Sequence, residues 1–89
     1  MTAIASALER TVVMVCGRIA HVEIAAQQGP AQLVASVEDE TGAIEVVFMG
    51  RRLVPGIRPG QRIEITGRVV TQGGSRRMYN PRYELSCPG

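Results

Sequence analysis

The sequence predicts an all-β fold of five short strands, arranged as a barrel or a sandwich. Hydrophobic and polar residues alternate in several stretches between Thr11 and Leu85, which is the period of half-buried strands. Turn-forming residues separate these stretches at positions 27–30, 39–42 and 72–75. The chain has 89 residues, which is the size of one small domain.

The first strand is expected to be long and bent. Val15 and Ile19 share one face, and Val22 then continues in the opposite phase. A change of phase near residues 20–21 indicates a β-bulge, which lets one strand serve two parts of a sheet. Residues 1–10 precede this strand as an N-terminal extension, either a short helix or a flexible segment.

The second and third strands flank an acidic turn at residues 39–42. The core-facing positions of the second strand are Leu33, Ala35 and Val37. The core-facing positions of the third strand are Ile44, Val46 and Phe48. Three outward positions of these strands, Val34, Val47 and Met49, are apolar, and we expect them to form a small exposed patch.

The last two strands follow a segment that is rich in glycine and proline. Residues 50–60 contain two prolines and three glycines, so little or no helix is expected between strands three and four. Leu53 and Ile57 are expected to close the end of the barrel instead. The fourth strand is expected over residues 61–71 and the fifth over residues 77–85, with an interruption at Asn80-Pro81.

The composition argues against several protein classes. With 45% hydrophobic and 20% charged residues, the chain has the balance of a folded protein. The apolar run Val12–Cys16 is too short to cross a bilayer, and residues 1–10 lack the features of a signal peptide. We therefore expect a cytoplasmic protein without a membrane partner, in which Cys16 and Cys87 are reduced thiols. Since His21 is the only histidine, we expect no metal site and no cofactor.

Charge is distributed unevenly along the chain. Residues 1–50 carry two arginines and six acidic residues, a net charge of −4, whereas residues 51–89 carry eight arginines and two acidic residues, a net charge of +6. There is no lysine, and arginine suits bidentate contacts to phosphate and stacking on bases. A GC-rich coding bias explains the preference for arginine equally well. The clustering in the second half indicates an anionic partner.

Four segments within Val12–Leu85 resemble the OB-fold. More narrowly, they resemble the wedge domain of RecG-type helicases and the small stand-alone actinobacterial OB-fold proteins related to it. In chain order they are residues 37–42, the strand AIEVVFMGRR, the sequence IRPGQRIEITGRV and the closing NPRYEL. The resemblance implies a five-stranded Greek-key barrel over residues 11–86, with a tail at residues 87–89. It also implies binding of single-stranded or forked nucleic acid across strands two and three.

The binding residues are expected to be one aromatic residue and several arginines at the margins of the barrel. Tyr79 is the best candidate for stacking on a base, with a structural role as its alternative, because Phe48 and Tyr83 follow core positions. The arginine candidates are Arg18, Arg51, Arg52, Arg76, Arg77 and Arg82. Among them Arg76 and Arg77 rank highest, because they follow a flexible loop that borders the expected channel. A solvated surface charge is the alternative for each arginine.

The sequence therefore predicts a non-catalytic nucleic-acid-binding module with low sequence specificity. Single-stranded or junction DNA is the expected partner, with RNA as a second possibility. No nucleophile has a visible base partner, so no enzyme is expected. The outer face of strands two and three carries Glu38 and Glu45, which is unusual for a surface that binds a polyanion. The alternative is a barrel that binds a protein partner or assembles with itself through the apolar patch on that face.

Overall fold

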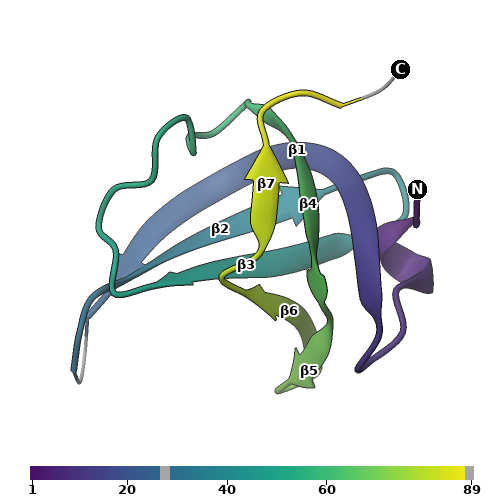
Figure 1. Ribbon diagram of the computed structural model, residues 1–89, viewed down its shortest axis with the longest axis horizontal. Helices are drawn as coiled ribbons and strands as arrows, with labels where there is room; N and C mark the ends of the chain where they lie inside the picture. The colour runs from purple at the N-terminus through teal and green to yellow at the C-terminus, as the bar shows by residue number, and fades with distance from the viewer. Residues whose placement is uncertain (27–28, 88–89) are drawn as a thin grey trace.

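The computed structural model describes residues 1–26 and 29–87, and in this part of the chain seven strands form one sheet (Figure 1). The strands are β1 (Val12–Ala25), β2 (Gln32–Glu38), β3 (Ala43–Met49), β4 (Arg62–Arg68), β5 (Val70–Gln72), β6 (Ser75–Tyr79) and β7 (Arg82–Glu84). Their hydrogen-bonded order is β5-β6-β3-β2-β1-β4-β7. All neighbours are antiparallel except β3 and β6. The expected turn at residues 27–30 and the expected tail at residues 87–89 lie partly outside the described residues.

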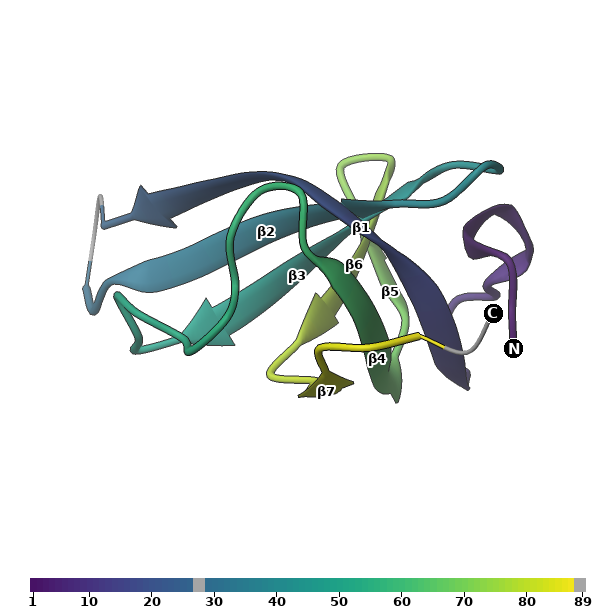
Figure 2. The ribbon, with the colours of Figure 1, turned by 90° about the horizontal axis from the view of Figure 1, so that it is seen from above.

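The long strand β1 belongs to both parts of the curled sheet (Figure 2). Its first half pairs with β4 and its second half with β2, and Arg18 has a partner on each side. The register shifts between Ile19 and His21, which confirms the predicted bulge. At Gly17 an added Cβ would lie 2.5 Å from the carbonyl oxygen of Glu38, so only glycine allows β2 to approach this closely. β1 can therefore bend and join the two parts of the sheet.

The prediction of an all-β fold is confirmed, but the number of strands is seven rather than five. The expected fourth strand is broken at Val69, whose backbone N–H donates to the Thr11 carbonyl and whose carbonyl accepts from the Arg10 N–H. The predicted interruption of the fifth strand is confirmed at Asn80, which has a φ of 49°, and at Pro81, which has no N–H. Among the described residues β5 and β7 are the edges of the sheet, which is therefore curled but not closed.

The hydrophobic core fills the inside of the curled sheet and confirms the predicted inward positions of β2 and β3. The β3–β4 loop (residues 50–61) contains no helix, as predicted, and covers one end of this core. Val54 and Ile57 are the residues of the loop that are buried there. The prediction was wrong for Leu53, because its side chain is 78% exposed. In an irregular loop no strand period decides which of two neighbouring apolar residues points inward.

The N-terminal segment packs on the curled sheet through a short 3-10 turn, η1 (Ile4–Ser6), whose residue Ile4 is fully buried. Asp39 holds this turn in place, because one of its carboxylate oxygens accepts the Ile4 N–H at 2.8 Å. The other oxygen accepts the N–H and the hydroxyl of Thr41 at 2.7 and 2.6 Å. Burial alone would raise the pKa of Asp39, but the hydrogen bonds outweigh it and hold that pKa below its ordinary value.

Cys16 and Cys87 form a disulfide, with their Cα atoms 5.8 Å apart. The expectation of reduced thiols was therefore wrong. Cys16 pairs with Glu64 of β4, and Glu64 pairs with Glu84 of β7, so the chain beyond β7 runs close to β1. This proximity depends on the sheet order and cannot be read from two cysteines that are 71 residues apart.

Candidate nucleic-acid interface

The parallel pairing of β6 with β3 places Tyr79 on the outer face of the sheet, beside Val47. The Tyr79 side chain is 39% exposed. Its hydroxyl donates a hydrogen bond to Oε1 of Gln72 at 2.6 Å and accepts one from Nη1 of Arg77 at 3.4 Å. One end of the ring is thus fixed, while part of the ring stays open to solvent.

Arg77 lies next to Tyr79 on the same face and forms an ion pair with Glu45 of β3. The distance between Arg77 Nε and Glu45 Oε1 is 3.1 Å, and each of the two side chains is 31% exposed. Because the charge of Arg77 compensates the carboxylate of Glu45, this part of the face repels a polyanion less than the sequence of β3 alone indicates. The hydrogen bond to Tyr79, together with the Coulombic effect of Glu45, raises the pKa of Arg77 above its ordinary value, so the guanidinium stays charged.

The apolar patch expected on the outer face of β2 and β3 is not exposed. Val34 is buried and Val47 is fully buried, whereas Met49 is 51% exposed. Val34 lies between Glu23 of β1 and Val47 in the sheet, and Val47 lies between Val34 and Tyr79. Side chains of neighbouring strands therefore cover both valines. The prediction of an exposed patch of three residues was wrong for two of them.

Arg76 and Arg77 point in different directions, because successive side chains of a strand lie on opposite faces. Arg76 Nη2 donates to the carbonyl of Ala5 at 3.1 Å, and its Nε donates to the carbonyl of Ala7 at 3.4 Å. Arg76 thus fastens the N-terminal segment to β6. The structure does not bring Arg76 and Arg77 together as one phosphate-binding pair.

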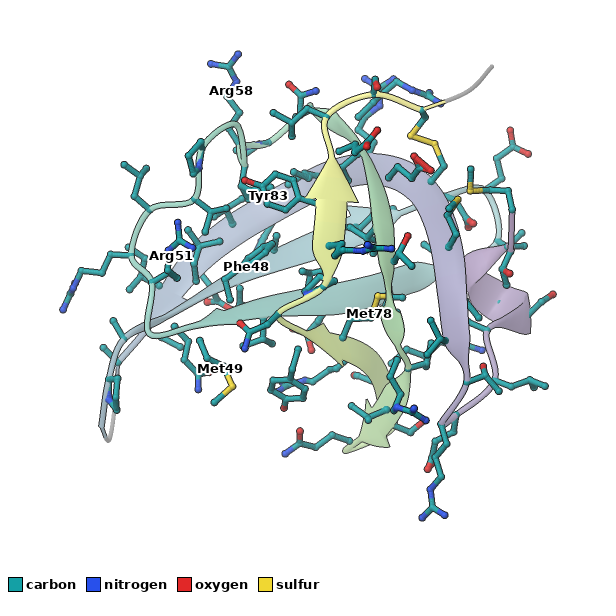
Figure 3. All side chains as sticks on the ribbon, viewed as in Figure 1. Phe48, Met49, Arg51, Arg58, Met78 and Tyr83 are labelled. Carbon is teal, nitrogen blue, oxygen red and sulfur yellow. A yellow bond between two sulfur atoms is a disulfide. The ribbon has the colours of Figure 1, made fainter. Side chains whose placement is uncertain are left out.

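Arg51 and Arg52 are exposed at the start of the β3–β4 loop. Within residues 1–26 and 29–87 neither guanidinium has a hydrogen bond or an ion pair to another side chain. Figure 3 shows Arg51 beside the part of the loop that faces Phe48, whereas Arg58 projects from the opposite end of the loop. Gly50 separates Arg51 and Arg52 from the end of β3 at Met49.

Arg18 and Arg82 lie on another part of the curled sheet, on the outer face of β1, β4 and β7. Arg18 lines a hollow of about 440 Å³ that is also lined by Arg62 and by the acidic residues Glu38, Asp39 and Glu40. Arg82 lines a second hollow, whose volume is about 280 Å³, together with Glu64 and Glu84. The seven candidate residues therefore do not form one continuous surface. Arg77 and Tyr79 contact each other, and Arg51 and Arg52 are neighbours in the chain.

Sequence reasoning missed Gln72 and Glu45 as the partners that position Tyr79 and Arg77. Gln72 pairs with Ser75 next to the glycine pair at 73–74, and so it lies on the same face of the β5–β6 hairpin as Tyr79. Glu45 becomes a partner only through the parallel pairing of β3 and β6, which joins distant parts of the chain. In the described residues no three His, Cys, Asp or Glu side chains gather as a metal site requires, and no helix is long and apolar enough to cross a membrane.

Three comparisons with known proteins bear on this arrangement. A family model described as OB-fold nucleic acid binding domain matches residues 13–88. The fold is similar to the solution NMR structure of the replication factor A related protein from Methanobacterium thermoautotrophicum, with a TM-score of 0.76 and 19% sequence identity. The similarity covers 97% of this chain and 90% of that chain. A comparison with curated proteins found no match.

Proposed function

The chain belongs to the family of OB-fold nucleic acid binding domains, and on this premise we propose that it binds single-stranded DNA across the outer face of β3 and β6. The observation that carries the proposal is the Tyr79 ring, which is partly exposed and is held at its hydroxyl by Gln72 and Arg77. A fixed aromatic ring stacks on a base with little loss of side-chain freedom and accepts every base. Binding is non-catalytic and has low sequence specificity.

The arginines near this face supply the contacts to phosphate. Arg77 lies beside Tyr79, and Arg51 and Arg52 extend the positive charge beyond the end of β3. DNA rather than RNA is proposed because the sequence resembles the wedge domain of RecG-type helicases. The resemblance of the sequence to the wedge domain of RecG-type helicases supports forked DNA as a second ligand.

A titration of fluorescent oligonucleotides tests the proposal. Fluorescence anisotropy is measured for a single strand, the matching duplex, a fork and an RNA of the same sequence. We expect the single strand and the fork to bind more tightly than the duplex or the RNA. The variant Tyr79→Leu should weaken binding by about five- to 100-fold, which corresponds to the loss of one stacked base. The matched variant Tyr79→Phe keeps the ring and should retain most of the affinity.

Two results would argue against this function. If no oligonucleotide binds at low salt, the chain is not a nucleic-acid binder under these conditions. If Tyr79→Phe and Tyr79→Leu weaken binding equally, the hydroxyl contacts matter rather than stacking. Binding of a protein partner, or self-assembly, has less support because Val34 and Val47 are buried. If the molecular mass measured by sedimentation velocity rises with protein concentration, self-assembly becomes the better supported function.

A further inference from the structure

A hollow of about 330 Å³ opens between the β3–β4 loop and the turn that joins β6 to β7. Its apolar lining comes from Phe48, Val54, Pro81 and Tyr83, and its rim from Met49, Arg51 and Asn80. Figure 3 shows Phe48 and Tyr83 side by side in this region, with Arg51 on the loop. The volume falls in the range of about 300–1,000 Å³ that is typical of small-ligand sites.

The floor of the hollow suits a flat apolar group. Phe48 and Tyr83 meet edge to face, with ring centroids 5.6 Å apart and an interplanar angle of 76°. The Tyr83 hydroxyl donates to the carbonyl of Pro55 at 3.1 Å, so its polar end is already bonded to the loop. Both rings are therefore held in place. Because Phe48 is only 5% exposed, the ring surface open to a ligand comes mainly from the half-buried Tyr83.

The rim offers hydrogen-bond donors. Asn80 has a φ of 49°, and its backbone N–H donates to the Val47 carbonyl at 2.7 Å. Its side-chain Oδ1 accepts the N–H of Met49 at 2.9 Å, which fixes the orientation of the amide. The amide NH₂ has no acceptor within the described residues, and the same is true of the Arg51 guanidinium. A ligand that meets both residues therefore presents hydrogen-bond acceptors to the rim.

The hollow adjoins the outer face of β3 and β6, where the proposed function places the bound DNA strand. Met49 is the last residue of β3 and lies on its outer face. Its side chain is 51% exposed and also lines the hollow. Residues 46–63 contain no acidic side chain, so a phosphate chain that leaves this face meets no negative charge along the loop. A strand bound beside Tyr79 can pass over Met49 and reach the rim.

We propose that this hollow binds one unstacked guanine base of the bound strand. Guanine presents O6 and N7 as adjacent acceptors, whereas adenine and cytosine present an amino group on the corresponding edge. Arg51 and the Asn80 amide supply the donors that the guanine edge requires, and the base packs on the exposed part of Tyr83 above the buried Phe48. The inference rests on the proposed function and adds to it a base preference at a single position of the strand.

The test uses thymine oligomers of about 12 nucleotides, within the length that one OB-fold covers. One oligomer has only thymine, one has a single guanine at its centre, and one has 7-deazaguanine there. We expect the guanine oligomer to bind about five- to tenfold more tightly than the thymine oligomer. The 7-deazaguanine oligomer lacks the N7 acceptor and should lose most of this advantage.

Two matched pairs of variants locate the effect in the hollow. Asn80→Asp keeps an oxygen for the Met49 N–H and a residue type that tolerates positive φ, but it removes the donor. Its control, Leu53→Asp, adds the same charge at an exposed residue of the loop outside the hollow. Arg51→Ala is compared with Arg58→Ala in the same loop. The guanine advantage should disappear in Asn80→Asp and Arg51→Ala and persist in both controls.

Failure of the inference can be told apart from failure of the proposed function. Equal affinity of the wild-type chain for all three oligomers overturns the guanine site and leaves single-strand binding intact. If the guanine oligomer still binds more tightly than the thymine oligomer in both Asn80→Asp and Arg51→Ala, the guanine is recognised elsewhere. That result also overturns the proposed site in the hollow. If none of the oligomers binds at low salt, the guanine site and the proposed function both fall.

Discussion

At the scale of single residues, Arg76 donates to the carbonyls of Ala5 and Ala7, whereas Arg77 pairs with Glu45 beside Tyr79. Arg76→Ala should therefore lower the free energy of unfolding by about 1 kcal/mol, because a charged donor to backbone carbonyls is lost. It should leave the affinity for single strands within about twofold of the wild type. Arg77→Ala should weaken binding by about fivefold, as expected for one lost phosphate contact at low salt.

Urea denaturation and anisotropy titrations of the two variants, done in parallel, check this division. Both replacements remove one positive charge from β6, so each serves as the control for the other. If Arg76→Ala reduces affinity as strongly as Arg77→Ala, the N-terminal side of the hairpin also contacts the strand. The assignment of Arg76 to the fold would then be wrong.

Asp39 gives the stability of the fold a dependence on pH. Its pKa in the folded protein lies below the ordinary value of 3.8, so its contribution to stability is complete above that value. The contribution is lost as the pH falls through the lower, folded pKa. Asp39→Asn should cost about 1 kcal/mol at neutral pH through weaker hydrogen bonds to Ile4 and Thr41.

Urea midpoints measured between neutral and acid pH test the role of Asp39. The curves of the wild type and of Asp39→Asn should converge at acid pH, where the carboxylate is protonated. A matched control, Glu40→Gln, changes the neighbouring exposed charge, for which no contact to the N-terminal segment is present in the described residues. A constant gap between wild type and Asp39→Asn at every pH would contradict the assigned role.

At the scale of elements, the alternation of residues predicted which side chains of β2 and β3 face the core, and a phase change predicted the bulge in β1. The pair Asn80-Pro81 also predicted the interruption between β6 and β7, whereas the interruption of the expected fourth strand at Val69 was not predictable from the sequence. Val69 is buried in the expected phase, but its backbone pairs with Thr11 and Arg10, which are nearly 60 residues earlier in the chain. Hydrogen bonds between segments that are distant in the chain leave no pattern in the local sequence.

The segment after β7 is held on β1 by the Cys16–Cys87 disulfide. It closes a loop of 71 residues, and a cross-link of that length restricts the unfolded chain strongly. Cys87→Ser should therefore lower the free energy of unfolding by about 2–4 kcal/mol in the oxidised protein. The reduced wild-type protein should behave like the variant in urea denaturation.

The double variant Cys16→Ser/Cys87→Ser serves as a control, because it should be unaffected by reductant. Equal stability of oxidised and reduced wild-type protein would contradict a stabilising disulfide. The thiol state in rapidly acid-quenched cell extracts, read by mass spectrometry after alkylation, also bears on the cytoplasmic location, which stays a prediction. Disulfides persist in oxidising compartments and are rare in the cytosol.

At the scale of the whole molecule, the charge balance predicted an anionic partner but not the face that binds it. Residues 51–89 carry a net charge of +6, yet their arginines are distributed over several sides of the molecule. Arg82 lies near Glu64 and Glu84, and Arg76 is bonded to backbone carbonyls. Which arginines share a surface depends on how the sheet curls. The net charge of a segment contains no information on the curling of the sheet.

This distribution predicts how binding depends on salt. If the strand contacts Arg51, Arg52 and Arg77 alone, about three phosphates are neutralised and the log–log slope of affinity against salt is about −2. Contacts to all six candidate arginines would give about −4.

Anisotropy titrations of a thymine oligomer over a series of potassium chloride concentrations measure the slope. Arg51→Ala should reduce its magnitude by about 0.7, whereas Arg82→Ala should leave it unchanged. A slope near −4 that both variants reduce equally would mean that the strand also wraps onto the face formed by β1, β4 and β7.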